Sequence, residues 1–189
     1  MFVLGHIGIG RKLAAPWARG LPALPLVLGT LLPDLLDKSL YYGLSWARGL
    51  VADELGLISG TRTIGHTGFF LLGLSTFALL RRSRGGAALA LGVATHLFLD
   101  NLLDLMGGGN VFQNGAAVAL FFPVLGFRFP VTPHGGLGEH GRSLVRPEII
   151  FSEILGLILL SGDLWKAIRL SGRSARALRR AKAGRSIGE

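Results

Sequence analysis

Long apolar blocks, rather than alternating or helical periods, dominate the pattern of hydrophobic positions along this chain. Residues 63–80 and 85–105 form runs of 18 and 21 residues, and residues 149–165 form a third run that ends at Trp165. A helix needs roughly 20 mainly apolar residues to cross the ~30 Å hydrocarbon core of a bilayer. The pattern therefore predicts three transmembrane helices, with Trp165 at a membrane interface.

Two other apolar segments are harder to interpret, one before the first run and one between the second and third runs. The uncharged part of residues 20–36 is short and contains three prolines, and residues 111–127 raise the same question. Such segments are typical of kinked spans or of re-entrant segments. The predicted fold is thus an all-α, polytopic membrane bundle of three transmembrane helices with one or two short or re-entrant segments. We expect residues 1–165 to form one membrane-embedded domain, followed by a basic cytoplasmic tail over residues 166–189.

Composition supports the membrane interpretation. Hydrophobic residues make up 50% of the chain and charged residues only 16%, whereas soluble domains carry about 25% charged residues. The chain has no cysteine, which excludes disulfides and thiolate metal ligands.

The distribution of basic residues predicts an orientation. Arg81, Arg82 and Arg84 join two of the predicted helices, and residues 166–185 hold eight of the 20 Lys and Arg residues. Basic residues near membrane spans favour the cytoplasmic side, so we expect an integral protein of a bacterial or archaeal cytoplasmic membrane. The tail has no aromatic residues for base stacking. It is therefore predicted to contact anionic membrane lipids rather than nucleic acid.

Several ionisable residues interrupt the apolar segments. His96 and Asp100 are four residues apart and share one face of their predicted helix, while His66 and Asp34 lie near the ends of others. The predicted orientation brings these groups toward the outer face of the membrane. Imidazoles and carboxylates are ligands of zinc and of harder divalent ions, and helical bundles build such sites from facing helices. The alternative is that each His is a hydrogen-bonded core residue and each Asp a cap or counter-ion.

Other charged residues near this layer allow more than one interpretation. Arg62 could pair with the carboxylates, bind an anionic phosphate or anchor the chain at the interface. Glu153 could be a ligand, a general base or the partner of a buried arginine. Asp104 is predicted to mark the end of its helix, and Asp37 joins the set of candidate ligands.

Several short motifs resemble a known family, the YdjM-like membrane-bound metal-dependent hydrolases. The similar segments are "HIGIG" at 6–10, "TLLPDLLDK" at 30–38, "RTIGHT" at 62–67, "ATHLFLDNLLD" at 94–104, Gly107 and "FFP" at 121–123. The motif style is also similar to that of the zinc-dependent phospholipase C proteins. The family's second motif has a His where this chain has Thr61, and a Ser where it has Thr67. The resemblance implies the metal ligands His6, Asp34, His66, His96 and Asp100, with Asp37 as a further candidate.

Two functions of different classes follow from these patterns. The first is a membrane-bound metal-dependent hydrolase that attacks an ester or phosphoester of a lipid-derived substrate with a metal-bound hydroxide. The metal would be zinc, with manganese or magnesium as alternatives; Arg62 would bind the substrate, and Asp37 or Glu153 would transfer the proton. The second is a non-catalytic membrane protein whose polar layer forms an ion or proton path or a structural metal site.

Overall fold

Every regular element in the described part of the chain is a helix. The computed structural model describes residues 3–107, 112, 115–131 and 145–185. The helices, in chain order, are α1 (Val3–Ala14), α2 (Ala23–Gly29), α3 (Leu32–Arg48), η1 (Ala52–Leu55), η2 (Ile64–His66), α4 (Gly68–Leu80), α5 (Arg84–Met106), α6 (Ala116–Leu120) and α8 (Pro147–Arg185), where η marks a 3₁₀ helix. The all-helical part of the prediction is confirmed.

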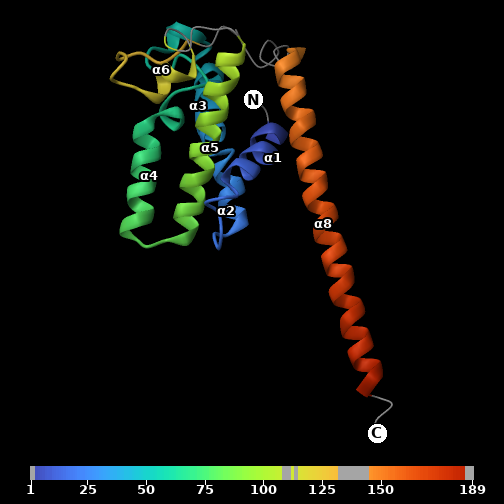
Figure 1. Ribbon diagram of the computed structural model, residues 1–189. Coiled ribbons are helices and arrows are strands. Elements are labelled where there is room, and N and C mark those ends of the chain that lie inside the picture. The colour runs from blue at the N-terminus through green and yellow to red at the C-terminus, as the bar shows by residue number, and fades with distance from the viewer. Residues whose placement is uncertain (1–2, 108–111, 113–114, 132–144, 186–189) are drawn as a thin grey trace.

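Helix α5 is the central element of the bundle, with α4 on one side and α1 and α2 on the other (Figure 1). It begins after Ser83, whose hydroxyl accepts a hydrogen bond from the Gly86 N–H at 3.0 Å. Glycines let α2 approach it closely, since a Cβ on Gly92 would lie 2.3 Å from the Leu26 carbonyl oxygen. The same helix carries His96 and Asp100, so α5 forms the frame on which the candidate site is built.

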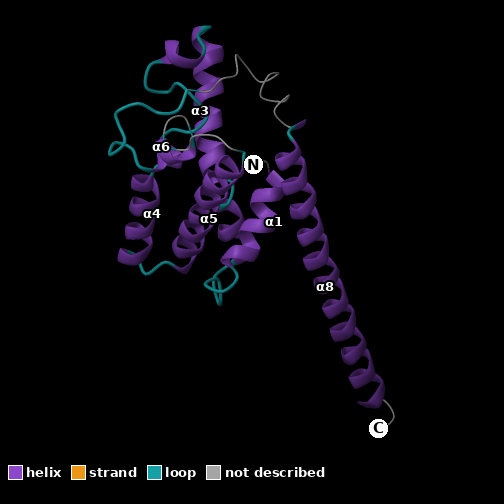
Figure 2. Cartoon of the chain, turned by 45° about the horizontal axis from the view of Figure 1, so that its top comes forward, coloured by secondary structure: helices purple, strands orange, loops and turns teal. Residues whose placement is uncertain are grey.

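Helix α8 is a single 39-residue helix that packs along α1 and then extends beyond the bundle (Figures 1 and 2). A Cβ on Gly8 would lie 2.3 Å from the Gly156 carbonyl oxygen, so the two backbones meet where neither has a side chain. Glu153 of α8 accepts hydrogen bonds from the Leu4 and Gly5 N–H groups, each at 2.9 Å. These contacts fix the first turn of α1, which also contributes His6.

The prediction of three transmembrane helices is wrong. Within the described ranges, α5 alone is long and apolar enough to cross a membrane. The apolar run at 63–80 does not form one helix, because η2 occupies its start and α4 has only 13 residues. The run at 149–165 belongs to α8, where Glu153 and Asp163 lower its hydropathy. Hydropathy over a window measures composition and does not show where a helix begins.

The two shorter segments also differ from a simple span. Residues 20–36 are divided between α2 and the start of α3, with a break at Thr30 and Leu31. Within 111–127 the regular element is the five-residue α6, while positions 111, 113 and 114 lie outside the described residues. The expected boundary at residue 166 falls inside the continuous α8, and positions 186–189 of the predicted tail are also outside the described part.

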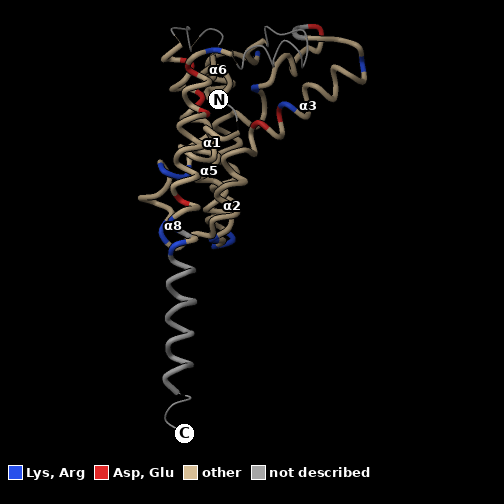
Figure 3. The backbone as a smooth tube through the Cα atoms, turned by 90° about the vertical axis from the view of Figure 1, so that its right-hand side faces the viewer, with Lys and Arg blue, Asp and Glu red and all other residues tan. Residues whose placement is uncertain are grey.

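Charged residues are unevenly distributed along the bundle. Lys and Arg gather at the end where α8 leaves the bundle, and Asp and Glu lie mainly in the other half (Figure 3). Many large apolar side chains are exposed on α4 and on the apolar half of α8, among them Phe69, Leu72, Leu80, Phe151 and Leu157. The acidic half of this apolar-surfaced bundle is where the candidate site lies.

Candidate metal centre

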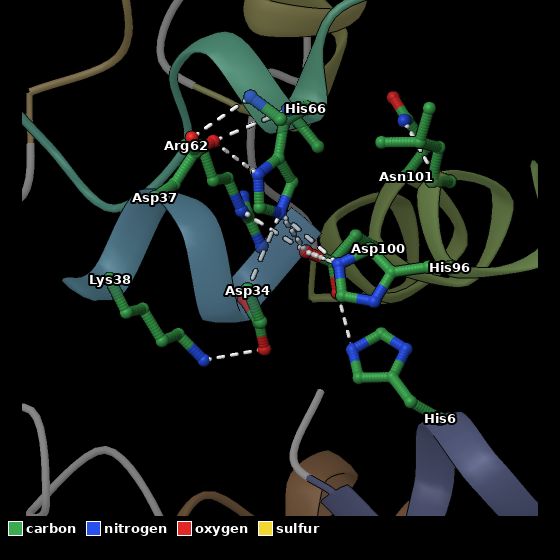
Figure 4. A network of polar contacts seen from close by, with 12 residues as sticks. His6, Asp34, Asp37, Lys38, Arg62, His66, His96, Asp100 and Asn101 are labelled. Carbon is green, nitrogen blue, oxygen red and sulfur yellow. Dashed lines mark hydrogen bonds and ion pairs between the residues drawn. The ribbon is translucent and has the colours of Figure 1, made fainter. Parts of the chain in front are cut away.

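All five predicted metal ligands come together in one buried cluster. His6 comes from α1, Asp34 from α3, His66 from η2, and His96 and Asp100 from α5 (Figure 4). The three histidines and Asp100 are each at most 3% exposed, and Asp34 is half-buried. Four separate elements therefore contribute side chains to this cluster.

His66 and His96 face each other through their Nε2 ring nitrogens. The two Nε2 atoms lie 3.2 Å apart. His66 Nδ1 lies 2.7 Å from Asp37 Oδ2, and His96 Nδ1 lies 2.8 Å from the Thr30 carbonyl oxygen, so each Nδ1 donates a hydrogen bond. Both Nε2 atoms then point into the same space. Two ligands of one tetrahedral zinc ion lie about 3.3 Å apart, given bond lengths of about 2.0–2.1 Å.

Carboxylate oxygens complete this arrangement. Asp100 Oδ2 lies 3.5 Å from His66 Nε2 and 3.9 Å from His96 Nε2. Asp34 Oδ1 lies 3.8 Å from His66 Nε2. On the other side of Asp100, its Oδ1 atom lies 3.3 Å from His6 Nε2. The cluster is therefore elongated, with Asp34 at one end and His6 at the other.

Asp37 holds His66 in position. Its Oδ2 accepts hydrogen bonds from the Thr63 and His66 N–H groups at 2.7 and 3.2 Å, besides the His66 ring, and its Oδ1 accepts from Gly65 N–H at 2.9 Å. Burial alone would raise the pKa of Asp37, but the hydrogen bond from His66 and those from the backbone hold it below its usual value. Both oxygens are engaged, which favours an orienting role for Asp37 over the predicted proton transfer.

The pKa of His66, the partner of Asp37, is shifted upward. Burial alone would lower the pKa of His66, but its hydrogen bonds to Asp100 and Asp37 and the charges of Asp100 and Asp34 raise it above the ordinary value. The surroundings of His66 thus favour positive charge at this position. A divalent cation bound by Nε2 would supply that charge.

Arg62 lies beside the cluster and pairs with two carboxylates. Its Nη1 and Nη2 atoms lie 2.5 and 3.2 Å from the two oxygens of Asp104, and its Nε lies 3.4 Å from Asp100 Oδ2. Burial alone would lower the pKa of Arg62, but the charges of Asp100 and Asp104 raise it. Asp104 also accepts a hydrogen bond from Ala116 N–H at 2.8 Å, and so connects α5 to α6. It does more than mark a helix end; its four-residue spacing from Asp100 was the signal for this role.

Two basic side chains balance part of the negative charge of the carboxylates near the cluster. Lys38 Nζ lies 2.6 Å from Asp34 Oδ2, and Arg62 is the second basic partner. These two cations pair with the carboxylates of Asp34, Asp100 and Asp104, while Asp37 pairs with His66. Such positive partners matter here because burying a carboxylate without a counter-ion is costly.

Glu153, predicted as a catalytic residue, lies at the N-terminus of α1. Its two oxygens accept hydrogen bonds from Leu4 and Gly5 N–H. A carboxylate in this position stabilises the positive end of the helix. The geometry favours a structural role for Glu153, namely holding the helix that carries His6.

Two groups of side chains in the described part of the chain could hold a metal ion. One consists of His6, His96 and Asp100, all buried, and the other of Asp34, His66 and His96; within each group the ligand atoms lie within 4.8 Å of one another. Nitrogen and oxygen donors of this kind suit zinc and manganese. The residues present therefore fit a divalent metal.

The chain was also compared with known proteins. No protein family, curated protein or solved structure matches it.

Proposed function

We propose that this protein is a metal-dependent hydrolase that acts on an ester or phosphoester of a lipid-derived substrate at the membrane. The observation that carries the proposal is the pair of Nε2 atoms of His66 and His96, 3.2 Å apart with both Nδ1 protons engaged elsewhere. A site that brings two imidazole Nε2 atoms together among carboxylates has the donor set of a divalent metal. The resemblance to the YdjM-like hydrolases supports the same chemistry.

The residues have distinct roles in this proposal. A bound divalent metal would polarise the substrate and lower the pKa of a water molecule. His66, His96, Asp34 and Asp100 would hold it, and Asp37 would keep the His66 ring in the tautomer that presents Nε2. Arg62, next to Asp100, would balance the charge of the carboxylates and attract an anionic substrate.

The membrane location is part of the proposal. Helix α5 is long and apolar enough to cross a membrane, and the basic turn at residues 81–84 favours a cytoplasmic N-terminal end for it. Asp100 lies sixteen residues after Arg84, about 24 Å along the helix axis. The site would then lie toward the outer face, where the polar ends of lipids are within reach.

Metal analysis of the purified protein in detergent tests the site. The wild type is expected to retain a divalent metal, and His66→Ala and His96→Ala are expected to lose it. Asp163→Asn is the matched control. This carboxylate of α8 pairs with Lys12 of α1 and does not belong to the cluster. Metal content that is the same in all four proteins would exclude the site.

A substrate panel tests the chemistry. Phospholipids, lipid phosphates and acylglycerols would be incubated with the protein, and released phosphate and fatty acid measured separately. Activity should disappear with a chelator and return when zinc or manganese is added. Hydrolysis that persists after complete metal removal would exclude the mechanism, and a bound metal without any hydrolysis would favour a structural metal site.

A further inference from the structure

His6 is a fully buried polar residue beside Asp100. Its side chain is 0% exposed, and neither of its ring nitrogens has a hydrogen-bond partner among the described residues. A buried polar atom that lacks a hydrogen bond is costly. The ring stacks on that of His96, with centroids 3.9 Å apart and planes at 16°, which fixes its orientation. The His6 ring is therefore held in place beside Asp100.

The Nε2 atom of His6 faces the second oxygen of Asp100. His6 Nε2 lies 3.3 Å from Asp100 Oδ1, whereas His66 Nε2 and His96 Nε2 lie 3.5 and 3.9 Å from Asp100 Oδ2. The two oxygens of this one carboxylate thus face different sets of imidazoles. A separation of 3.3 Å is about the distance between two ligands of one tetrahedral metal ion.

We infer that the cluster binds two divalent metal ions, with the Asp100 carboxylate as the bridge between them. Asp34, His66, His96 and Asp100 Oδ2 bind the first ion, and His6 and Asp100 Oδ1 bind the second. Carboxylate-bridged ions in two-metal hydrolases are about 3.5–4 Å apart and hold the attacking and leaving oxygens between them. The inference rests on the proposed function, and it assigns to His6 an ion of its own rather than a place around the first.

The packing of α1 supports this assignment. Gly8 packs against Gly156 of α8, and Glu153 binds the first-turn N–H groups of α1. On the other side of α1, a Cβ on Gly10 would lie 3.1 Å from the Thr30 side chain and 3.2 Å from Thr95. Helix α1 is thus fixed between α8 and α5, so His6 keeps its distance from Asp100 without a hydrogen bond of its own.

The stoichiometry and magnetic coupling of bound Mn²⁺ test the inference. The full-length protein in detergent, first stripped of metal, would be titrated with Mn²⁺ and followed by electron paramagnetic resonance. Two equivalents are expected for the wild type, with the spectrum of an exchange-coupled pair at saturation. The His6→Ala variant is expected to bind one equivalent and to give the six-line spectrum of an isolated ion. His6→Gln, which keeps the size of the side chain but not the imidazole, should behave in the same way.

Each outcome separates this inference from the proposed function. A wild type that binds one equivalent, with an uncoupled spectrum at saturation, would overturn the second ion and leave the hydrolase proposal intact. A wild type that binds none would overturn both. If His6→Ala loses both ions, the wild-type titration and its coupled or uncoupled spectrum still decide the question.

Discussion

Replacing Asp37 by Asn gives the most direct test of how the site is organised. Asp37 accepts three hydrogen bonds on Oδ2 and one on Oδ1, and one of them comes from the His66 ring. An Asn side chain has one acceptor oxygen and one NH₂ group. If the oxygen occupies the Oδ2 position, the NH₂ group faces the Gly65 N–H, and two donors oppose each other.

The magnitude follows from these contacts. A buried unpaired donor costs about 1–3 kcal/mol, and the remaining bonds weaken because hydrogen bonds to a charged group contribute about 1.5–3 kcal/mol and neutral ones about 1. The free energy of unfolding of Asp37→Asn is therefore expected to fall by about 2–4 kcal/mol. Loss of a carboxylate that orients a metal-binding histidine typically weakens metal binding about 10–100-fold.

Two measurements check this prediction. Metal affinity would be determined by competition with a chromophoric chelator, and stability by thermal unfolding in detergent. Asp163→Asn, the same chemical change away from the cluster, should leave the affinity unchanged. The reasoning would be refuted by an Asp37→Asn variant with wild-type affinity, and if its hydrolysis rate fell at the same time, Asp37 would have the proton-transfer role predicted from the sequence.

Three further predictions concern the frame around the site. Arg62→Met should destabilise the fold by about 3 kcal/mol, because it leaves carboxylates unpaired. Adding Asp104→Asn to this variant should recover part of the lost stability. Strictly additive effects of the two substitutions in thermal unfolding would contradict the pairing. Gly156→Ala should lower the free energy of unfolding by about 1–3 kcal/mol, because its Cβ would lie 2.2 Å from a backbone oxygen of α1. Gly162→Ala is the control: its Cβ would have no atom within 4 Å, so it should stabilise α8 by about 0.5–1 kcal/mol. Equal melting temperatures of the two variants would argue against close packing of α1 and α8. The hydrogen bond from Lys12 lowers the pKa of Asp163. This ion pair therefore stabilises the fold at neutral pH, and its contribution is lost as the pH falls through that lowered pKa. Asp163→Asn should lower the free energy of unfolding by at most about 1 kcal/mol at pH 7, and the difference should vanish toward pH 2.

The cluster could be predicted from the sequence where local spacing decides the geometry. His96 and Asp100 are four residues apart, so any helix brings them to one face. The position of His66 beside them depends on η2, whose turn is fixed by the hydrogen bonds of three backbone N–H groups to Asp37. No periodic pattern encodes such a turn. His6 came from the family resemblance alone, because the position of α1 depends on its contacts with α8 and α5.

The transmembrane prediction was wrong for a related reason. Hydropathy records how apolar a stretch is, but the bonds that start and end helices depend on individual residues. Thr67 accepts a hydrogen bond from Phe70 N–H at 3.0 Å and so begins α4 after His66. This cap shortens an 18-residue apolar run to a 13-residue helix. The roles of Asp37 and Glu153 were missed because they depend on backbone donors, which the sequence does not distinguish.

Helix α5 shows how one segment can be apolar enough for a membrane and still carry ionisable groups. Half of its most apolar window is buried within the protein. His96, Asp100 and Leu103 lie on the buried side, whereas Phe98 and Leu105 are exposed. Ionisable residues in membrane helices are tolerated where protein covers them and partners balance their charge. Here α1, α2 and α3 contact α5. In the proposed membrane location, its exposed face would contact lipid and its buried face would present the candidate metal ligands to the protein interior.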